Sequence, residues 1–329
     1  MLSLAPILAH FPQLGSLRQV LSLEGAGGFS GSRIWRLETD LGRLCLRRWP
    51  RQHPSEARLR LIHQTLLGWG AAGLGFIPAP IATRAGATFV SHADHFWELT
   101  PWMPGQADFH AHPAPARLHH ALRAVARLHV ASSRNHPATS APAPAIVERH
   151  DKLRQLLAGG IETITAALPQ APTPRLGELG RSIIVQFHPR APEIAARLHS
   201  AAAATTELFP VIRDLWHDHI LFTGDEVTGI VDFGALRVDT PACDLARLLG
   251  SLVENDQDRW RLGLAAYEEI RPLSPQEHLL IPLLDESQAL LSGLFWLEWL
   301  CLERHEFPDL ASIESRLEKI LQRLKTGLQ

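Results

Sequence analysis

Two aspartates and one histidine in the second half of the 329-residue sequence have the residue types and the spacing that phosphoryl transfer requires. Asp214 lies in a short polar segment, His219 follows it, and Asp232 closes the apolar run Ile230–Val231. Transfer of a phosphoryl group needs a carboxylate near the acceptor hydroxyl and ligands that hold a metal ion against the phosphates. The alternative is a pair of strands whose aspartates only cap turns, but a carboxylate that ends an apolar strand seldom serves packing.

The segment His217-Asp218-His219 permits a different interpretation, a metal cluster of a hydrolase. Histidines two positions apart face one metal ion only on an extended strand. A zinc site needs at least three protein ligands, and no distant run of histidines is clearly paired with this one. A zinc hydrolase is therefore the third interpretation, behind two kinase-like ones.

A glycine-rich segment near the N-terminus, residues 25–32, lies between two strand-like patterns. Glycines let the backbone approach an anion closely and point its N–H groups toward it. The Gly-Lys-Ser/Thr of a Walker loop does not follow, and that loop joins a strand to a helix. We expect Gly27, Gly28 and Ser30 either to cover the phosphates of a nucleotide or to form an ordinary turn.

The first third of the chain has the pattern of a small sheet with one principal helix. Alternating residues at 34–39 and 44–47, joined by the turn Asp40-Leu41-Gly42, predict a hairpin. Apolar residues at helical spacing predict a helix over 55–69. Two more strands are expected near 87–91 and 96–100.

After the connector Trp102-Met103-Pro104-Gly105 the pattern becomes helical. An exposed loop rich in Pro, Ser and Ala is expected from Ser132 to Pro144, and two short strands around the turn at 223–226. The sequence thus predicts an α+β protein with a small β-rich N-terminal lobe, residues 1–102, and a large helical lobe, residues 103–329. The helices expected in the second lobe include residues 118–128, 146–168, 176–188, 191–204 and most of 241–326.

At this point a resemblance to a known family becomes specific. The stretches RDLWHDHILF, GIVDFG and DTPACDLA are similar to the HGDLHxxNxL, xIDF and DPxxDLA motifs of aminoglycoside phosphotransferases, choline kinases and their relatives. GGFSGSRIWRLETDLGRLCLRRWP resembles the opening of that family, WELTPWMPG its adenine-binding strand and hinge, and AVARLH the helix that follows. The likeness touches most of residues 20–252 and implies a protein-kinase-like fold.

The resemblance also implies roles for individual residues. Asp214 falls on the catalytic aspartate, Asp232 on the metal-binding aspartate, and His219 on the metal-binding asparagine. Arg47 falls where the family holds the α- and β-phosphates, commonly with lysine, and no lysine occurs before Lys152. If Arg47 needs a helix partner, Glu56 is the candidate, although Glu56 equally suits a solvated first helical turn.

Two further features concern the second lobe. Asp244 follows Thr240-Pro241, a good start for a helix, and we interpret it as a residue that braces the catalytic loop. The segment 294–299 mixes aromatic residues with an acid. Such a segment is more often core, but it would also suit a cationic acceptor.

Composition narrows the class of protein. A formal net charge of -2 gives no basic footprint for nucleic acid. No apolar stretch reaches the ~18 residues that a membrane span needs, and the N-terminus lacks the basic region of a signal peptide. Three cysteines far apart fit a reduced, cytoplasmic compartment. Oligomeric state does not follow from the sequence.

We therefore expect a phosphotransferase that uses ATP or GTP with Mg²⁺ or Mn²⁺ and acts on a hydroxyl of a small-molecule acceptor. The alternative is a catalytically weak or inactive nucleotide-binding pseudokinase. It is favoured by His219 in place of asparagine and by Ile212-Arg213 in place of His-Gly. Retention of both Asp214 and Asp232 argues against it.

Overall fold

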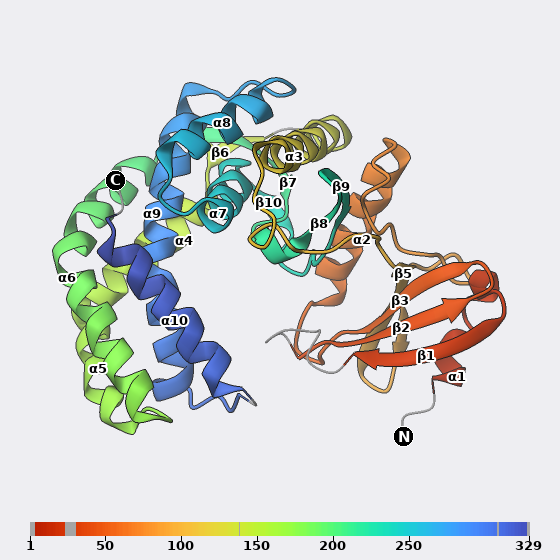
Figure 1. The fold of residues 1–329 in the computed structure, drawn as a ribbon, viewed down its shortest axis with the longest axis horizontal. Helices are drawn as coiled ribbons and strands as arrows, with labels where there is room; N and C mark the ends of the chain where they lie inside the picture. Colours follow the sequence, from red (N-terminus) through yellow and green to blue (C-terminus); the bar gives the residue numbers. More distant parts are fainter. Residues whose placement is uncertain (1–3, 24–30, 138, 308, 328–329) are drawn as a thin grey trace. The chain divides into compact units, whose positions relative to one another are not determined.

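The computed structural model describes residues 4–23, 31–137, 139–307 and 309–327. The chain forms two compact units (Figure 1). The first contains Met1–His136 and His217–Arg237, and the second contains Pro137–Trp216 and Val238–Gln329. Residues 103–136 and 217–237 thus belong to the same unit as the N-terminal sheet. The functional boundary expected after residue 102 stays a prediction.

The first unit is built on an antiparallel sheet of five strands in the order β1-β2-β3-β5-β4 (Figure 1). The expected hairpin is confirmed, because Thr39 of β2 faces Gly42 of β3 across the loop Asp40–Leu41. Gly42 has φ 129°, a backbone conformation that favours glycine. The strands are β1 Leu17–Leu23, β2 Arg33–Thr39, β3 Gly42–Arg48, β4 Val90–His92 and β5 His95–Pro101.

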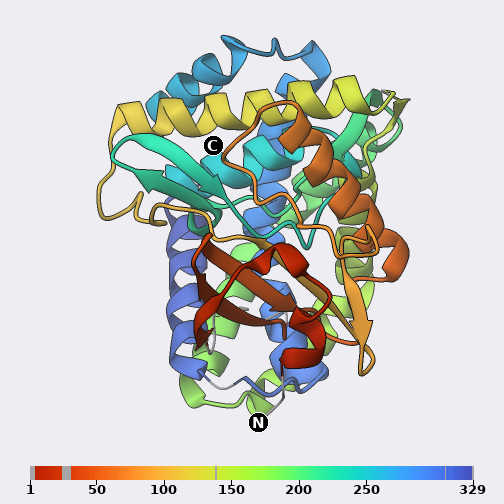
Figure 2. The same cartoon turned by 90° about the vertical axis from the view of Figure 1, so that its right-hand side faces the viewer.

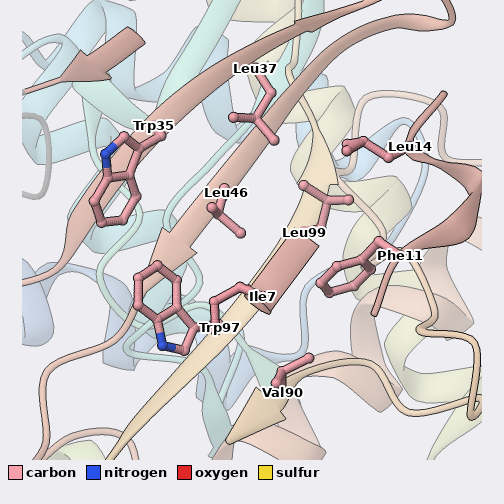
Figure 3. Packing of buried hydrophobic residues seen from close by; sticks show 9 residues of the cluster. All are labelled: Ile7, Phe11, Leu14, Trp35, Leu37, Leu46, Val90, Trp97 and Leu99. Carbon is pink, nitrogen blue, oxygen red and sulfur yellow. The ribbon is translucent and has the colours of Figure 1, made fainter. Parts of the chain in front are cut away.

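One face of this sheet carries an apolar core that also receives side chains from α1 (Ala5–Leu8) and the short helix η1 (Pro12–Leu14) (Figure 3). Alternation along each strand sends every second residue into this core. Trp35 and Trp97 stack with ring centroids 5.4 Å apart. The cluster consists of Ile7, Phe11, Leu14, Trp35, Leu37, Leu46, Val90, Trp97 and Leu99.

Two helices and a second hairpin complete the first unit. Helix α2 (Glu56–Ala71) begins at Ser55, whose side chain accepts a hydrogen bond from the Arg58 N–H. Helix α3 (Pro115–Asn135) packs against α2 and against the hairpin of β8 (Ile220–Thr223) and β9 (Glu226–Ile230) (Figure 2). The chain enters this hairpin through a short 3-10 helix, η5 (His217–His219).

The second unit is mainly helical. Helix α9 packs against α6, α7 and α10, and α6 runs beside α10 (Figure 1). A small sheet in the order β10-β7-β6 accompanies these helices. Within the described residues no helix is long and apolar enough to cross a membrane. The elements are β6 Thr139–Pro142, α4 Pro144–Gln155, the π-helical η3 Leu156–Gly160, α5 Ile161–Ala167, η4 Leu168–Gln170, α6 Pro174–Ala202, β7 Thr205–Val211, β10 Arg237–Asp239, α7 Ala242–Leu252, α8 Gln257–Glu268, α9 Pro275–Leu297, the π-helical η6 Glu298–Leu302 and α10 Leu310–Lys325.

Three sequence-based expectations about elements were wrong. Two helices were expected over 176–204, but α6 continues through Pro189 and Pro192. Tertiary packing on α4, α9 and α10 outweighs the backbone hydrogen bonds that these prolines remove. The helix expected over 146–168 is interrupted at Gly159, which has φ 118°. The loop expected over 132–144 contains β6, which pairs with β7.

Candidate active site

Asp232 follows β9 directly and has the geometry of a residue held for function. Its backbone has φ 62°, a left-handed conformation that costs a non-glycine residue about 1–3 kcal/mol and is often found at functional sites. One carboxylate oxygen lies 3.4 Å from Nη1 of Arg47, and the other lies 3.7 Å from Nε2 of His219. Asp232 therefore lies between Arg47 and His219. Its side chain is 46% exposed and still reaches solvent.

The electrostatic environment keeps Asp232 ionised. Desolvation opposes ionisation, but the charges of Arg47 and His219 and a hydrogen bond from the Gly234 N–H outweigh it and hold the pKa of Asp232 below its ordinary value. One carboxylate and one adjacent imidazole suit a divalent ion whose other ligands are phosphate oxygens and water. Asp232 and His219 therefore fit a metal ion bound together with a nucleotide.

Arg47 is fixed by a buried polar network in the sheet. It lies on β3 opposite Glu98 of β5, and its Nε is 3.7 Å from a Glu98 oxygen. Glu98 also binds His63 of α2 at 2.6 Å and Nε1 of Trp49 at 2.9 Å. The Arg47 guanidinium lies 4.7 Å from the Trp49 ring centre. Arg47 is thus held from two sides, by Glu98 and by Asp232.

The network favours the charged form of Glu98. Burial would raise its pKa, but the hydrogen bond with His63, the charge of that ring when protonated, and Arg47 lower it below the ordinary value. Burial would also lower the pKa of Arg47, but Asp232 and Glu98 raise it. Arg47 therefore carries its positive charge inside the first unit.

The expected pairing of Arg47 with Glu56 is wrong. Glu56 lies in the first turn of α2, its side chain is 52% exposed, and it binds Arg60 one turn along the helix. Glu98 takes the place that we expected for Glu56, because β3–β5 pairing brings it opposite Arg47. Gly27, Gly28 and Ser30 lie outside the described residues, and their expected phosphate contacts stay a prediction.

In the second unit, Asp244 braces the segment that carries Asp214, as the sequence predicted. Its two carboxylate oxygens accept hydrogen bonds from the N–H groups of Ile212 at 2.9 Å and Arg213 at 2.6 Å. Asp244 is completely buried in the first turn of α7. Arg213 has φ 67° and forms ion pairs with Glu148 and the buried Asp239. This backbone is therefore fixed immediately before Asp214.

Asp214 itself is accessible and oriented. Its side chain is 53% exposed, and Oδ1 accepts a hydrogen bond from Nε of Arg247 at 2.9 Å. Arg247 comes from α7, the helix that also supplies Asp244. One helix thus both braces the backbone before Asp214 and orients its carboxylate.

Among the residues of these networks that the sequence did not predict are Glu98, His63 and Arg247. Glu98 gave one usable signal, since it is an acid inside the apolar strand 96–100. His63 and Arg247 occupy ordinary helical positions, and their sequence context contains no such signal.

The zinc interpretation finds no support in the described part of the chain, where no group of three or more His, Cys, Asp or Glu side chains is arranged to hold a metal ion. His217 has its Nε2 3.4 Å from Asp218, and its ring packs on His110 at 4.4 Å between centroids. A zinc site needs three converging protein ligands, and the described residues around His217 do not form such a group.

A comparison with known protein families shows to which family the chain belongs. The profile of the phosphotransferase enzyme family matches residues 23–280, which include Arg47, Asp214, His219 and Asp232. The chain belongs to this family. Membership confirms the resemblance that the RDLWHDHILF and GIVDFG motifs indicated.

Among curated proteins, the chain is similar to homoserine kinases. It is 35% identical to that of Methylobacterium nodulans over 112 residues, 30% of this chain and 35% of that enzyme. It is 28% identical to that of Gluconobacter oxydans over 231 residues, 67% of this chain and 65% of that enzyme. The chain therefore spans between about a third and two thirds of the length of these relatives.

Among solved structures, the fold is similar to that of a spectinomycin phosphotransferase in complex with ADP and spectinomycin. The TM-score is 0.72 at 10% identity, over 99% of this chain and 98% of that one. This likeness confirms the α+β, protein-kinase-like fold expected from the sequence.

Proposed function

We propose that the protein is a small-molecule kinase that transfers the γ-phosphoryl group of ATP or GTP to a hydroxyl, with Mg²⁺ or Mn²⁺ as the metal. One observation carries this proposal. In a member of the phosphotransferase enzyme family, the ionised Asp232 lies in a left-handed backbone conformation between Arg47 and His219. The proposed phosphate-binding residue and the proposed metal ligands are therefore adjacent within one unit.

Each residue has a distinct part in the proposed reaction. Arg47 binds the phosphates, and Gly27, Gly28 and Ser30 cover them. Asp232 and His219 hold the metal ion, which neutralises charge on the phosphates when bound. Asp214 orients the acceptor hydroxyl and takes its proton. The acceptor oxygen forms a bond to the γ-phosphorus, the β–γ bridging P–O bond breaks, and the nucleoside diphosphate leaves with that electron pair.

The curated relatives suggest the acceptor to test first. They are named homoserine kinases, and homoserine is a small molecule with one primary hydroxyl. We propose homoserine or a similar small hydroxy compound as the acceptor. The presence of His219 in place of asparagine favours the pseudokinase alternative. The contacts of Arg247 with Asp214 and of Arg47 with Asp232 count against it, because they hold both aspartates in place.

The test separates the roles of the two aspartates. Asp214→Asn should lower kcat for homoserine about 10²- to 10⁴-fold, the range for loss of a general base, with nucleotide affinity nearly unchanged. Asp232→Asn should also weaken metal-dependent nucleotide binding, because the metal loses its anionic ligand. Coupled measurement of nucleoside diphosphate release and calorimetric titration of nucleotide provide both readouts.

Asp218→Asn is the matched control, since Asp218 belongs to the same loop, is half exposed and has no part in the proposed reaction. It should retain activity. Loss of activity in Asp218→Asn equal to that in Asp214→Asn would favour the metal-cluster interpretation. Wild-type protein that binds nucleotide but phosphorylates no acceptor with either metal would establish the pseudokinase.

A further inference from the structure

A polar pocket of about 560 Å³ opens in the second unit where β7 begins. Its walls come from β6 and β7, from the loop between α8 and α9, and from the first turn of α9. Among the described residues that line it, none belongs to the segment 212–219 that carries Asp214 and His219. A strand rises about 3.3 Å per residue, so Glu207 in the pocket lies roughly 13 Å from Val211 at the far end of β7. The pocket is therefore separate from the proposed site of phosphoryl transfer.

An ion-pair network fixes the wall of the pocket at Arg271. Nη2 of Arg271 donates hydrogen bonds to Glu207 and to Glu277, both at 2.8 Å, and Nη1 donates to the hydroxyl of Tyr267 at 3.3 Å. Burial would lower the pKa of Arg271, but its hydrogen bonds and the neighbouring acids raise the pKa above the ordinary value. Arg271 is thus charged, and groups of the chain itself engage both of its terminal nitrogens.

The first turn of α9 forms a second fixed wall. Ser274 Oγ accepts a hydrogen bond from the Glu277 N–H at 3.2 Å, and Glu277 accepts one from the Ser274 N–H at 2.8 Å. This capping box, with Pro275 at the start of the helix, restricts the backbone of the turn. Across the pocket, Ser140 of β6 pairs with Glu207 of β7. The polar groups of the pocket are therefore held in place before any ligand binds, which lowers the entropic cost of binding.

The pocket carries a net negative charge. The charged residues that line it, within the described part of the chain, are Glu207, Glu277 and Arg271. Glu277 is 1% exposed and is used by Arg271 and Ser274. The side chain of Glu207 is 42% exposed, and only its Oε2 has a hydrogen-bond partner among the described residues. One carboxylate oxygen thus faces the pocket unneutralised, which favours a positively charged ligand over an anion.

Hydroxyl groups supply most of the remaining polar lining. Ser140 and Thr205 are exposed in the pocket, and Ser274 lies beside them on the α9 side. Thr206 also lines the pocket; its side chain is 5% exposed, and its buried Oγ1 has no hydrogen-bond partner among the described residues. A hydroxyl both donates and accepts hydrogen bonds, and a buried one without a partner is destabilising by about 1–3 kcal/mol. This lining suits a ligand that carries hydroxyl groups of its own.

We propose that the pocket binds a small hydroxylated organic cation, whose ammonium group pairs with Glu207 while its hydroxyl groups bond to the serine and threonine side chains. The ligand is not the acceptor of the proposed reaction, and no covalent bond is made or broken at this site. The inference therefore goes beyond the proposed kinase activity and does not depend on it.

Three probes with the same three-carbon skeleton separate charge from shape. Serinol (2-amino-1,3-propanediol) carries an ammonium and two hydroxyl groups, glycerol replaces the ammonium by a hydroxyl, and glycerate carries a carboxylate. Calorimetric titration should give binding of serinol at least about tenfold tighter than binding of glycerol, as expected for one charge-assisted hydrogen bond. Glycerate should bind more weakly than glycerol. Equal affinities for serinol and glycerol would overturn the proposed site.

Glu207→Gln removes the charge and keeps the shape of the side chain. It should weaken serinol binding about tenfold or more and leave glycerol binding unchanged. Glu318→Gln is the matched control, because Glu318 is 47% exposed and pairs with Arg175 at 2.6 Å, much as Glu207 pairs with Arg271. The control should bind serinol like the wild type, and urea unfolding should show that both variants are folded. Unchanged serinol affinity in Glu207→Gln would overturn the proposal.

Asp214→Asn separates the pocket from the acceptor site. Serinol also has hydroxyl groups that an acceptor site could bind, so its affinity is measured in this variant as well. Affinity equal to that of the wild type supports a separate site. Serinol binding that is lost in Asp214→Asn and kept in Glu207→Gln would place serinol at the acceptor site and overturn the proposal. Because the readout is binding, a protein without kinase activity still tests the pocket, and failure of the pocket leaves the proposed kinase activity intact.

Discussion

Glu98→Gln tests whether the buried network in the sheet positions Arg47. The substitution keeps the shape of the side chain and removes its charge. At 3.7 Å and an effective dielectric constant of about 20, the Arg47–Glu98 attraction is about 4 kcal/mol before desolvation is subtracted. Removing one partner of a buried pair typically costs about 3–5 kcal/mol. Glutamine can still accept the Trp49 hydrogen bond, so we expect a loss of about 2–4 kcal/mol in the free energy of unfolding.

The assay is urea unfolding followed by tryptophan fluorescence, at several pH values. The pKa of Glu98 is lowered in the folded protein. Its stabilisation is therefore fully present above the pKa of an unfolded glutamate, about 4.3, and is lost as the pH falls through the lower folded-state pKa. The difference between wild type and Glu98→Gln should be constant above about pH 5 and shrink below about pH 4.

Glu56→Gln is the control that separates the two candidate partners of Arg47. Because Glu56 is exposed and, within the described part of the chain, pairs with Arg60 of the same helix, its substitution should change the unfolding free energy by less than about 0.5 kcal/mol. Glu98→Gln should also weaken nucleotide binding, since Arg47 loses its support. A Glu98→Gln protein as stable as Glu56→Gln, with unchanged nucleotide affinity, would refute this reasoning.

Two further predictions concern the nucleotide and the metal. Arg47→Ala should weaken binding of ATP about tenfold or more, and Arg48→Ala should weaken it much less. The reason is that strand alternation sends Arg48 to the opposite face of the sheet, against Trp97. Equal affinities of the two variants for ATP, measured by calorimetry, would show that another residue holds the phosphates. His219→Asn should shift the metal preference from Mn²⁺ toward Mg²⁺, because an imidazole suits transition metals and Mg²⁺ prefers oxygen ligands. If the metal-dependence curves of the wild type and His219→Asn superimpose, His219 does not bind the metal.

The sequence by itself determined the parts whose signals are local. The β2–β3 hairpin follows from alternation around a glycine turn, and α2 follows from apolar residues at helical spacing. The order of Asp214, His219 and Asp232 along a short segment indicated phosphoryl transfer before any contact was known. The bracing role of Asp244 was also predicted, from the Thr240-Pro241 helix start, although its hydrogen bonds reach the N–H groups of Ile212 and Arg213, 32 and 31 positions earlier in the chain.

Only the tertiary structure decided which distant residues complete these local parts. Glu98, not Glu56, supports Arg47, because the register of β3 on β5 brings the two side chains together. The ring of Trp216 contacts Arg247 of α7 and Arg316 of α10 through packing that no local pattern encodes. The physical reason is common to both cases. Hydrophobic burial sets how strands and helices pack, and the polar contacts that tune charge follow from that packing rather than from spacing along the chain.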